Sequence, residues 1–132
     1  MAKPMAYAFV LEELGSRLSP DRLRVKPMFG SHALYVDEKI VFILRRKENS
    51  SRDNGVWVAM MPERIESVAK QFPALRLIEM FQTTGRTGFS GWLNLPESEE
   101  GFEESVYELC RLVASGDPRI GKIPKPKKRI GH

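Results

Sequence analysis

Near the N-terminus, apolar residues recur every three to four positions, and charged side chains occupy the positions between them. This spacing is typical of an amphipathic helix that buries one side. Proline is tolerated in the first turn of a helix and ends one elsewhere, so we expect a helix from Pro4 to Leu18 that stops at Ser19-Pro20. The apolar residues that mark its buried side are Tyr7, Val10, Leu11, Leu14 and Leu18.

Between residues 25 and 60 the pattern changes to that of extended strands. The segment 40–44 is a β-branched and aromatic run suited to a buried strand. Pro27 lacks the N–H that a sheet ladder needs, which places its strand at a sheet edge or a bulge. The stretch 45–54 is wholly polar and runs into Asp53-Asn54-Gly55, a hairpin-turn signal, so we expect a mobile loop there. The predicted strands are 25–29, 32–36, 40–44 and 56–60.

The second half of the chain alternates between the two periods. A helix is predicted to begin at Pro62 and to end before Pro73, with Ile65, Val68, Ala69 and Phe72 facing inward. Strands are expected at 75–80 and 89–95, the second with a bulge at Gly91. Ser98 is the predicted N-cap of a last helix that closes at Ser115-Gly116. The buried stripe of that helix is Phe102, Val106, Leu109 and Val113.

This order of elements favours antiparallel hairpins over the βαβ units of nucleotide-binding folds. A single sheet covered by the helices would bury all the apolar stripes. We therefore predict an α+β fold, a two-layer sandwich with a largely antiparallel sheet and helices on one face. One domain spans residues 1–116, and residues 117–132, rich in glycine, proline and lysine, form a flexible basic tail.

The positive charge of the chain is concentrated at its C-terminal end. The sequence has 21 basic and 17 acidic residues, and six of the basic ones follow residue 118, so 15 basic residues remain against all 17 acidic ones in the body. Any attraction to nucleic acid therefore depends on the tail.

Composition also indicates a compartment. The longest apolar run, Ile40–Leu44, is far shorter than the roughly 18 residues that cross a bilayer, so no membrane association is expected. The first residues lack the apolar core of a signal peptide. The single cysteine, Cys110, cannot form an internal disulfide, which fits a reducing compartment. We expect a cytoplasmic protein.

Candidate catalytic groups are few. Catalysis by acid-base or nucleophilic groups usually draws on histidine or an activated thiol, and the chain offers only His32, His132 and Cys110. We interpret His32 as a structural or exposed histidine and Cys110 as a small buried hydrophobe. Neither a metal site nor a cofactor is expected, because the possible ligands are too few and too far apart.

Two segments carry possible binding chemistry. The glycines around Gly85-Arg86-Thr87-Gly88 favour a β-turn, and the alternative is a ligand-contacting loop in which Arg86 anchors an anion. In the tail, closely spaced cations on a proline-stiffened segment could neutralise phosphates without reading sequence, and the alternative is a solubilising tail. The candidate nucleic-acid-binding residues are Lys122, Lys125, Lys127, Lys128 and Arg129.

A family resemblance adds to this interpretation. Met28-Phe29-Gly30 leads into Ser31-His32-Ala33-Leu34-Tyr35-Val36-Asp37, which resembles the opening of the TfoX N-terminal domain family. The segments Val56-Trp57-Val58, Gly91-Trp92-Leu93 and 107–113 are similar to MmcQ/YjbR-like proteins. The resemblance implies a two-layer α/β domain of the secretion-chaperone-like type, cytoplasmic, without established enzymatic activity, in a family linked to regulation of competence genes.

Residues and resemblance together predict a non-enzymatic regulatory or protein-interaction module whose partner is another protein or a second copy in a homodimer. Two alternatives stay open. One is weak, sequence-independent nucleic-acid binding through the tail. The other is a small-ligand binder or an enzyme that uses His32, Arg86 and a pocket over the sheet.

Overall fold

The computed structural model describes residues 5–83 and 90–124 of the chain. Within these residues, six strands form one sheet in the order β1-β2-β3-β4-β6-β5, and every neighbouring pair is antiparallel. The predicted α+β fold is confirmed. The strands are β1 (Leu23–Met28), β2 (Ser31–Val36), β3 (Lys39–Arg45), β4 (Gly55–Ala59), β5 (Arg76–Leu77) and β6 (Trp92–Pro96).

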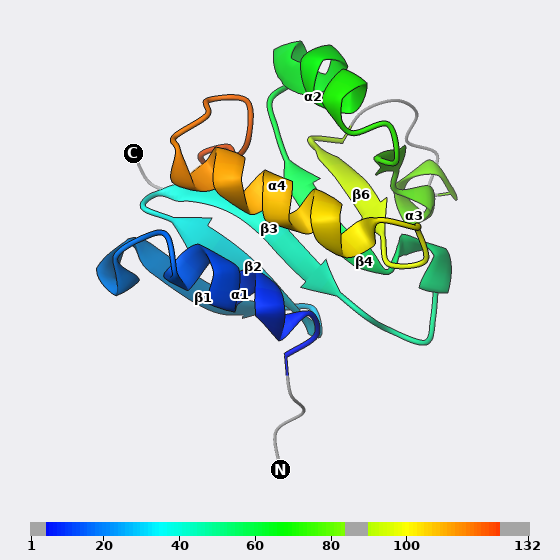
Figure 1. Ribbon diagram of the computed structural model, residues 1–132. Helices are drawn as coiled ribbons and strands as arrows, with labels where there is room; N and C mark the ends of the chain where they lie inside the picture. Colours follow the sequence, from blue (N-terminus) through cyan, green and yellow to red (C-terminus); the bar gives the residue numbers. More distant parts are fainter. Residues whose placement is uncertain (1–4, 84–89, 125–132) are drawn as a thin grey trace, which may run out of the picture.

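Helices α1 (Ala8–Gly15) and α4 (Phe102–Ala114) lie across the same face of the sheet (Figure 1). Helix α2 (Ile65–Gln71) contributes Val68 to the same core. The core between these helices and the sheet buries side chains that include Leu14, Phe42 and Leu109. Short 3-10 turns occur at Pro20–Arg22, Ser51–Asp53 and Pro62–Arg64.

A β-bulge in β3 decides which side chains face the helices. Leu34 pairs with Phe42 and Tyr35 pairs with Ile40, so Val41 is an extra residue in β3. A bulge of this kind interrupts the alternation of side chains. Val41 and Phe42 consequently both join the helix-side core, whereas Ile40 and Ile43 face the other way.

The face of the sheet turned away from α1 and α4 carries a second apolar cluster, so the sheet is buried on both sides. In the described chain this face has one helix, the short α3 (Glu79–Thr83), whose Phe81 ring lies 5.6 Å from that of Trp57. The prediction of helices on one face therefore misses α3. The buried members of the cluster are Ala33, Tyr35, Ile40, Ile43, Trp57, Ala59 and Ile78.

Three predicted elements have wrong boundaries. The first helix, expected from Pro4 to Leu18, spans only Ala8–Gly15. The strand expected at 75–80 is limited to Arg76–Leu77, because the buried carboxylate of Asp53 accepts the backbone N–H groups of Glu79 at 2.7 Å and Met80 at 3.0 Å and so starts α3. The last helix is capped by Gly101 with φ of 80°, not by Ser98. This left-handed backbone conformation favours glycine, which has no Cβ.

The polar segment 45–54, expected to be mobile, is anchored at both ends by buried side chains. The Asn54 Oδ1 accepts a hydrogen bond from Arg45 Nη1 at 2.8 Å and from the Lys47 backbone N–H at 2.9 Å. The Arg45 guanidinium also donates to the carbonyl oxygens of Ser50 and Asn49, at 2.9 and 3.0 Å. Between these anchors, Glu48–Arg52 is exposed.

The first part of the predicted tail packs against the domain. We call Asp117–Pro124 the C-terminal strap. Gly116, with φ of 81°, ends α4 in a Schellman motif in which the Asp117 N–H bonds the Leu112 carbonyl. Ile120 is buried in the helix-side core, so the strap differs from the flexible segment that its composition predicts.

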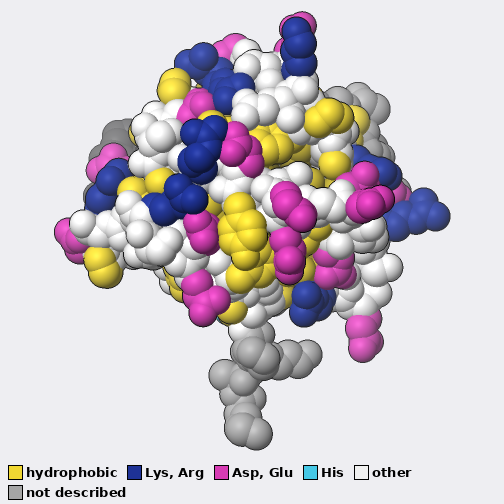
Figure 2. Space-filling view, in the orientation of Figure 1, with side chains coloured by type: hydrophobic (Ala, Val, Ile, Leu, Met, Phe, Trp, Pro, Cys, Tyr) yellow, Lys and Arg dark blue, Asp and Glu magenta, His cyan; other side chains and the backbone are white. Residues whose placement is uncertain are grey.

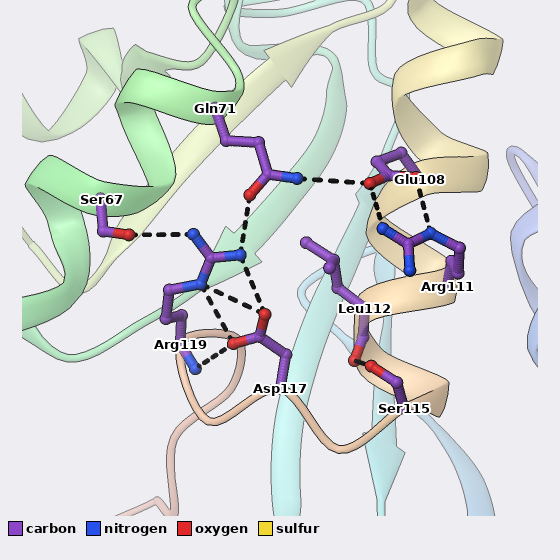
Figure 3. Close-up of polar contacts among 8 residues, drawn as sticks. All are labelled: Ser67, Gln71, Glu108, Arg111, Leu112, Ser115, Asp117 and Arg119. Atoms are coloured by element: carbon purple, nitrogen blue, oxygen red, sulfur yellow. Dashed lines mark hydrogen bonds and ion pairs between the residues drawn. The ribbon is translucent and has the colours of Figure 1, made fainter.

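Polar contacts tie the strap to two helices (Figure 3). The Arg119 guanidinium donates to Ser67 Oγ at 2.9 Å and to Gln71 Oε1 at 2.7 Å, both on α2, and pairs with the Asp117 carboxylate at 2.9 Å. Gln71 in turn donates to Glu108 of α4 at 3.3 Å. Arg119 belongs to the six basic residues near the C-terminus, but its guanidinium holds the strap against the domain.

The helix side of the molecule has an ordinary protein surface. Figure 2 shows Lys and Arg side chains intermixed with Asp and Glu over this face, with apolar side chains between them. Charges of both signs at close spacing do not favour a single charged partner. The charge on the helix side therefore gives no argument for a charged partner there.

Candidate functional site

A groove of about 870 Å³ lies on the face of the sheet opposite α1 and α4. Tyr35, Ile40, Ile43 and Trp57, from β2, β3 and β4, line it along the strands. We call it the open-face groove. Since Trp57 and Ile43 are largely buried, they form the walls of a recess and not a flat apolar patch.

The Met-Phe-Gly element forms one end of the groove. Phe29 and Gly30 both have positive φ, 51° and 80°, as the two-residue loop of a type I′ hairpin requires. A bulky residue in this conformation is an outlier. The turn holds the Phe29 ring 91% exposed beside the groove, and the Lys47 ammonium donates to the Phe29 carbonyl.

Helix α3 forms one side of the groove. Asp53 positions both this helix and Trp57, which lies on the floor of the groove. The Asp53 carboxylate holds the first N–H groups of α3, and the Asp53 carbonyl accepts the Trp57 indole N–H at 2.8 Å. Met80 and Phe81 of α3 line the groove next to Trp57. Asp53 thus couples the floor of the groove to its side.

The strap closes the end of the groove opposite the Met-Phe-Gly turn. Its backbone pairs with two strands, because the Gly121 N–H donates to Ala59 at 2.7 Å and Lys122 exchanges two 3.0 Å hydrogen bonds with Ile40. Lys122 and Ile123 line the groove. Ile123 is 63% exposed and Met61 45%, so apolar side chains also form the rim.

The Lys122 side chain lies within the groove and not in solvent. Its ammonium sits over the Trp92 ring, 4.9 Å from the centroid, and is half-buried. Burial lowers the pKa of Lys122 below its usual value, since withdrawal from water disfavours the charged form. Lys122 forms no ion pair with any described residue.

The predicted site residues are not brought together. His32 is half-buried on β2, opposite Pro27 and Leu44, and does not line the groove, although its neighbour Ser31 does. Arg86 lies outside the described residues, and so do four of the five candidate nucleic-acid-binding cations, Lys125, Lys127, Lys128 and Arg129. Lys122, the fifth, is held against the sheet.

Sequence reasoning missed Trp57, Met80 and Phe81 as groove residues. One signal could have indicated the groove: β3 and β4 are continuous apolar runs and not alternating ones, and continuous runs are typical of strands buried on both faces. The helix α3 left no comparable signal. Its start depends on Asp53, which is 26 residues away in sequence.

Cys110 is expected to be unreactive in the folded protein. Its side chain is fully buried on α4, and desolvation raises the pKa of the thiol to about 12. Because the thiolate is the nucleophile, iodoacetamide at pH 7.5 should leave the native thiol unmodified and should alkylate it in guanidinium chloride. Mass spectrometry distinguishes the two states, and rapid labelling of the native protein would contradict the burial of α4.

Neither a metal cluster nor a membrane-spanning helix is present in the described residues. In residues 5–83 and 90–124, no three His, Cys, Asp or Glu side chains lie close enough together to hold a metal ion. In the same residues, none of the helices has the length and apolar character needed to cross a membrane. The open-face groove is the candidate functional site of the described residues.

Comparison with known proteins gives one relative and no function. No protein-family model matches the chain, and no solved structure matches it. An uncharacterized 12.7 kDa protein encoded in the trpE 5′ region of Spirochaeta aurantia is 53% identical over 45 residues, which are 33% of this chain and 36% of that protein. The chain thus matches about a third of the length of this curated relative.

Proposed function

We propose that the protein is a non-enzymatic binding module that takes an apolar ligand into the open-face groove. The observation that carries this proposal is a recess of about 870 Å³ walled by aromatic, methionine and isoleucine side chains. Ligand sites are typically concave, apolar and of this size. The wider expectation of a regulatory role, drawn from the resemblance to the TfoX N-terminal domain family, fits a module whose ligand alters its contacts with a partner.

The side chains at the rim of the groove indicate that the groove binds a ligand and is not only a feature of the packing. Three of the six large apolar side chains that are exposed in the described chain, Phe29, Met61 and Ile123, line the groove. Phe29 is moreover held there by a strained turn, and strained backbone tends to occur at functional sites. Exposed apolar side chains gathered around one recess are typical of ligand and partner sites.

A neutral, solvatochromic dye tests this function. Nile red is expected to bind the wild-type protein, and Met61→Glu should weaken binding about tenfold, because a carboxylate at the rim has to be desolvated. Tyr107→Glu is the matched control, since Tyr107 is similarly exposed, 42% against 45%, but lies on α4. A fluorescence titration in which both variants bind as the wild type does, or in which the wild type does not bind, would contradict the proposal.

Nucleic-acid binding is the second candidate, and it now concerns four residues. Because Lys122 lies over Trp92, the proposed phosphate contacts reduce to Lys125, Lys127, Lys128 and Arg129. Removing residues 125–132 should abolish a salt-dependent shift of DNA mobility while leaving Ile120 and the strap in place. DNA binding that survives this truncation would exclude the tail as its cause.

A further inference from the structure

The open-face groove carries positive charge without compensating negative charge. Arg45, Lys47 and Lys122 line it, and among the described residues that line it none is an aspartate or a glutamate. An apolar recess with a low local dielectric strengthens the attraction between such cations and an anion. The charge of the groove therefore bears on the chemistry of its ligand.

Two of the three cations already have acceptors. The Arg45 guanidinium donates to three oxygens of the 45–54 loop, and the Lys47 ammonium donates to the Phe29 carbonyl. The Lys122 ammonium has no hydrogen-bond or ion-pair acceptor among the described residues, and it lies over the Trp92 ring and next to Gly91. A half-buried ammonium with three donors lacks the oxygen partner that its burial calls for.

The backbone around Lys122 is built to hold this ammonium in place. Three hydrogen bonds to Ile40 and Ala59 fix the strap backbone at Gly121 and at Lys122 itself. Opposite it, Gly91 has φ of 93°, and a Cβ at this position would collide with Lys122 Nζ. Gly91 thus leaves the space that the ammonium occupies at the end of the groove.

The shape of the groove favours a small molecule over a peptide strand. Its walls come from the face of the sheet, whereas a peptide that adds a strand needs a free sheet edge. From Ile40, beside Lys122, to Arg45 the groove follows six residues of β3, and the five steps between them span roughly 17 Å at the rise of an extended strand. An apolar chain can lie along this length.

We infer that the ligand of the open-face groove is a small apolar molecule with one carboxylate, which binds Lys122 while the apolar part lies along Trp57 and Ile43. This inference rests on the proposed function and adds the ligand class to it. A single ammonium at one end of an apolar recess matches a single carboxylate. Lys122 favours a ligand with a negative charge, and the side chains of the groove walls contact the apolar part of the ligand.

The test compares two ligands of equal chain length, decanoate and 1-decanol, as competitors of Nile red bound to the full chain. For the wild type, decanoate is expected to displace the dye at about a tenfold lower concentration than 1-decanol, because only decanoate gains a charge-assisted hydrogen bond. In Lys122→Met this ratio should fall to about one. The ratio of the two half-displacement concentrations cancels any change in the affinity for the dye itself.

Two further variants separate the role of Lys122 from general charge. Lys122→Arg keeps the cation and should keep most of the preference for decanoate, and Lys39→Met, an exposed lysine of β3 that does not line the groove, should leave the preference unchanged. A Lys122→Met ratio equal to that of the wild type, or equal displacement by both ligands in the wild type, would overturn the inference while dye binding upheld the groove. Absence of dye binding would instead overturn the proposed function.

Discussion

Replacing Gly55 by alanine is expected to destabilise the protein by roughly 3 kcal/mol. Gly55 has φ of 149°, which a residue with a side chain rarely adopts, and a Cβ there would collide with the backbone oxygen of Leu95 on β6. This contact cannot be relieved by rotating a side chain, so β4 and β6 would have to separate. The midpoint of thermal unfolding should fall by about 10 °C.

A second glycine supplies the control for this result. Gly15 ends α1, and a Cβ at Gly15 meets no atom within 4 Å. Gly15→Ala should therefore stabilise the protein by about 0.5 kcal/mol through helix propensity. If thermal unfolding followed by circular dichroism gave Gly55→Ala the midpoint of the wild type, the close approach of β4 and β6 at this residue would be refuted.

Asp53→Ala is expected to cost about 3 kcal/mol and to weaken ligand binding in the same variant. The substitution removes both acceptors of the α3 N–H groups, at Glu79 and Met80, in a buried site where water cannot replace them freely. Since α3 carries Phe81 beside Trp57, the side of the groove should loosen with it. Urea unfolding gives the stability, and Nile red titration gives the binding.

Asp53→Asn separates the hydrogen bonds from the packing. Asparagine has the same shape and keeps one acceptor oxygen, so we expect about half the loss of stability seen for alanine. Equal losses in the two variants would mean that charge, and not the pair of N–H contacts, is what Asp53 contributes. No loss in either would mean that α3 starts without it.

The helix-side half of the fold was predictable because it depends on local patterns. The stripes Val10-Leu14 and Val106-Leu109 carry the helical period, and the structure buries them against the sheet as expected. The strand pattern located β1 to β4 to within two residues. The errors arose at Glu79 and Gly101, where a distant carboxylate and a backbone conformation set the helix start.

The groove was not predictable because its parts meet only in three dimensions. Lys122 lies 30 residues after Trp92 in a segment rich in glycine, proline and lysine, and such composition is usual for solvated tails. What holds the strap is Ile120 in the core and backbone pairing with Ile40. Gly91, expected to mark a bulge, instead leaves room for an ammonium.

The bulge in β3 sets how the chain tolerates a change of length. In a regular strand, losing one residue turns every following side chain over to the other face of the sheet. Val41 is the extra residue of the bulge, so its deletion would leave Ile40 opposite Tyr35 and Phe42 opposite Leu34, each on its present side. A deletion at the bulge therefore keeps the side chains that line the groove and those that pack against the helices on their present faces, whereas a deletion in a regular part of β3 would not.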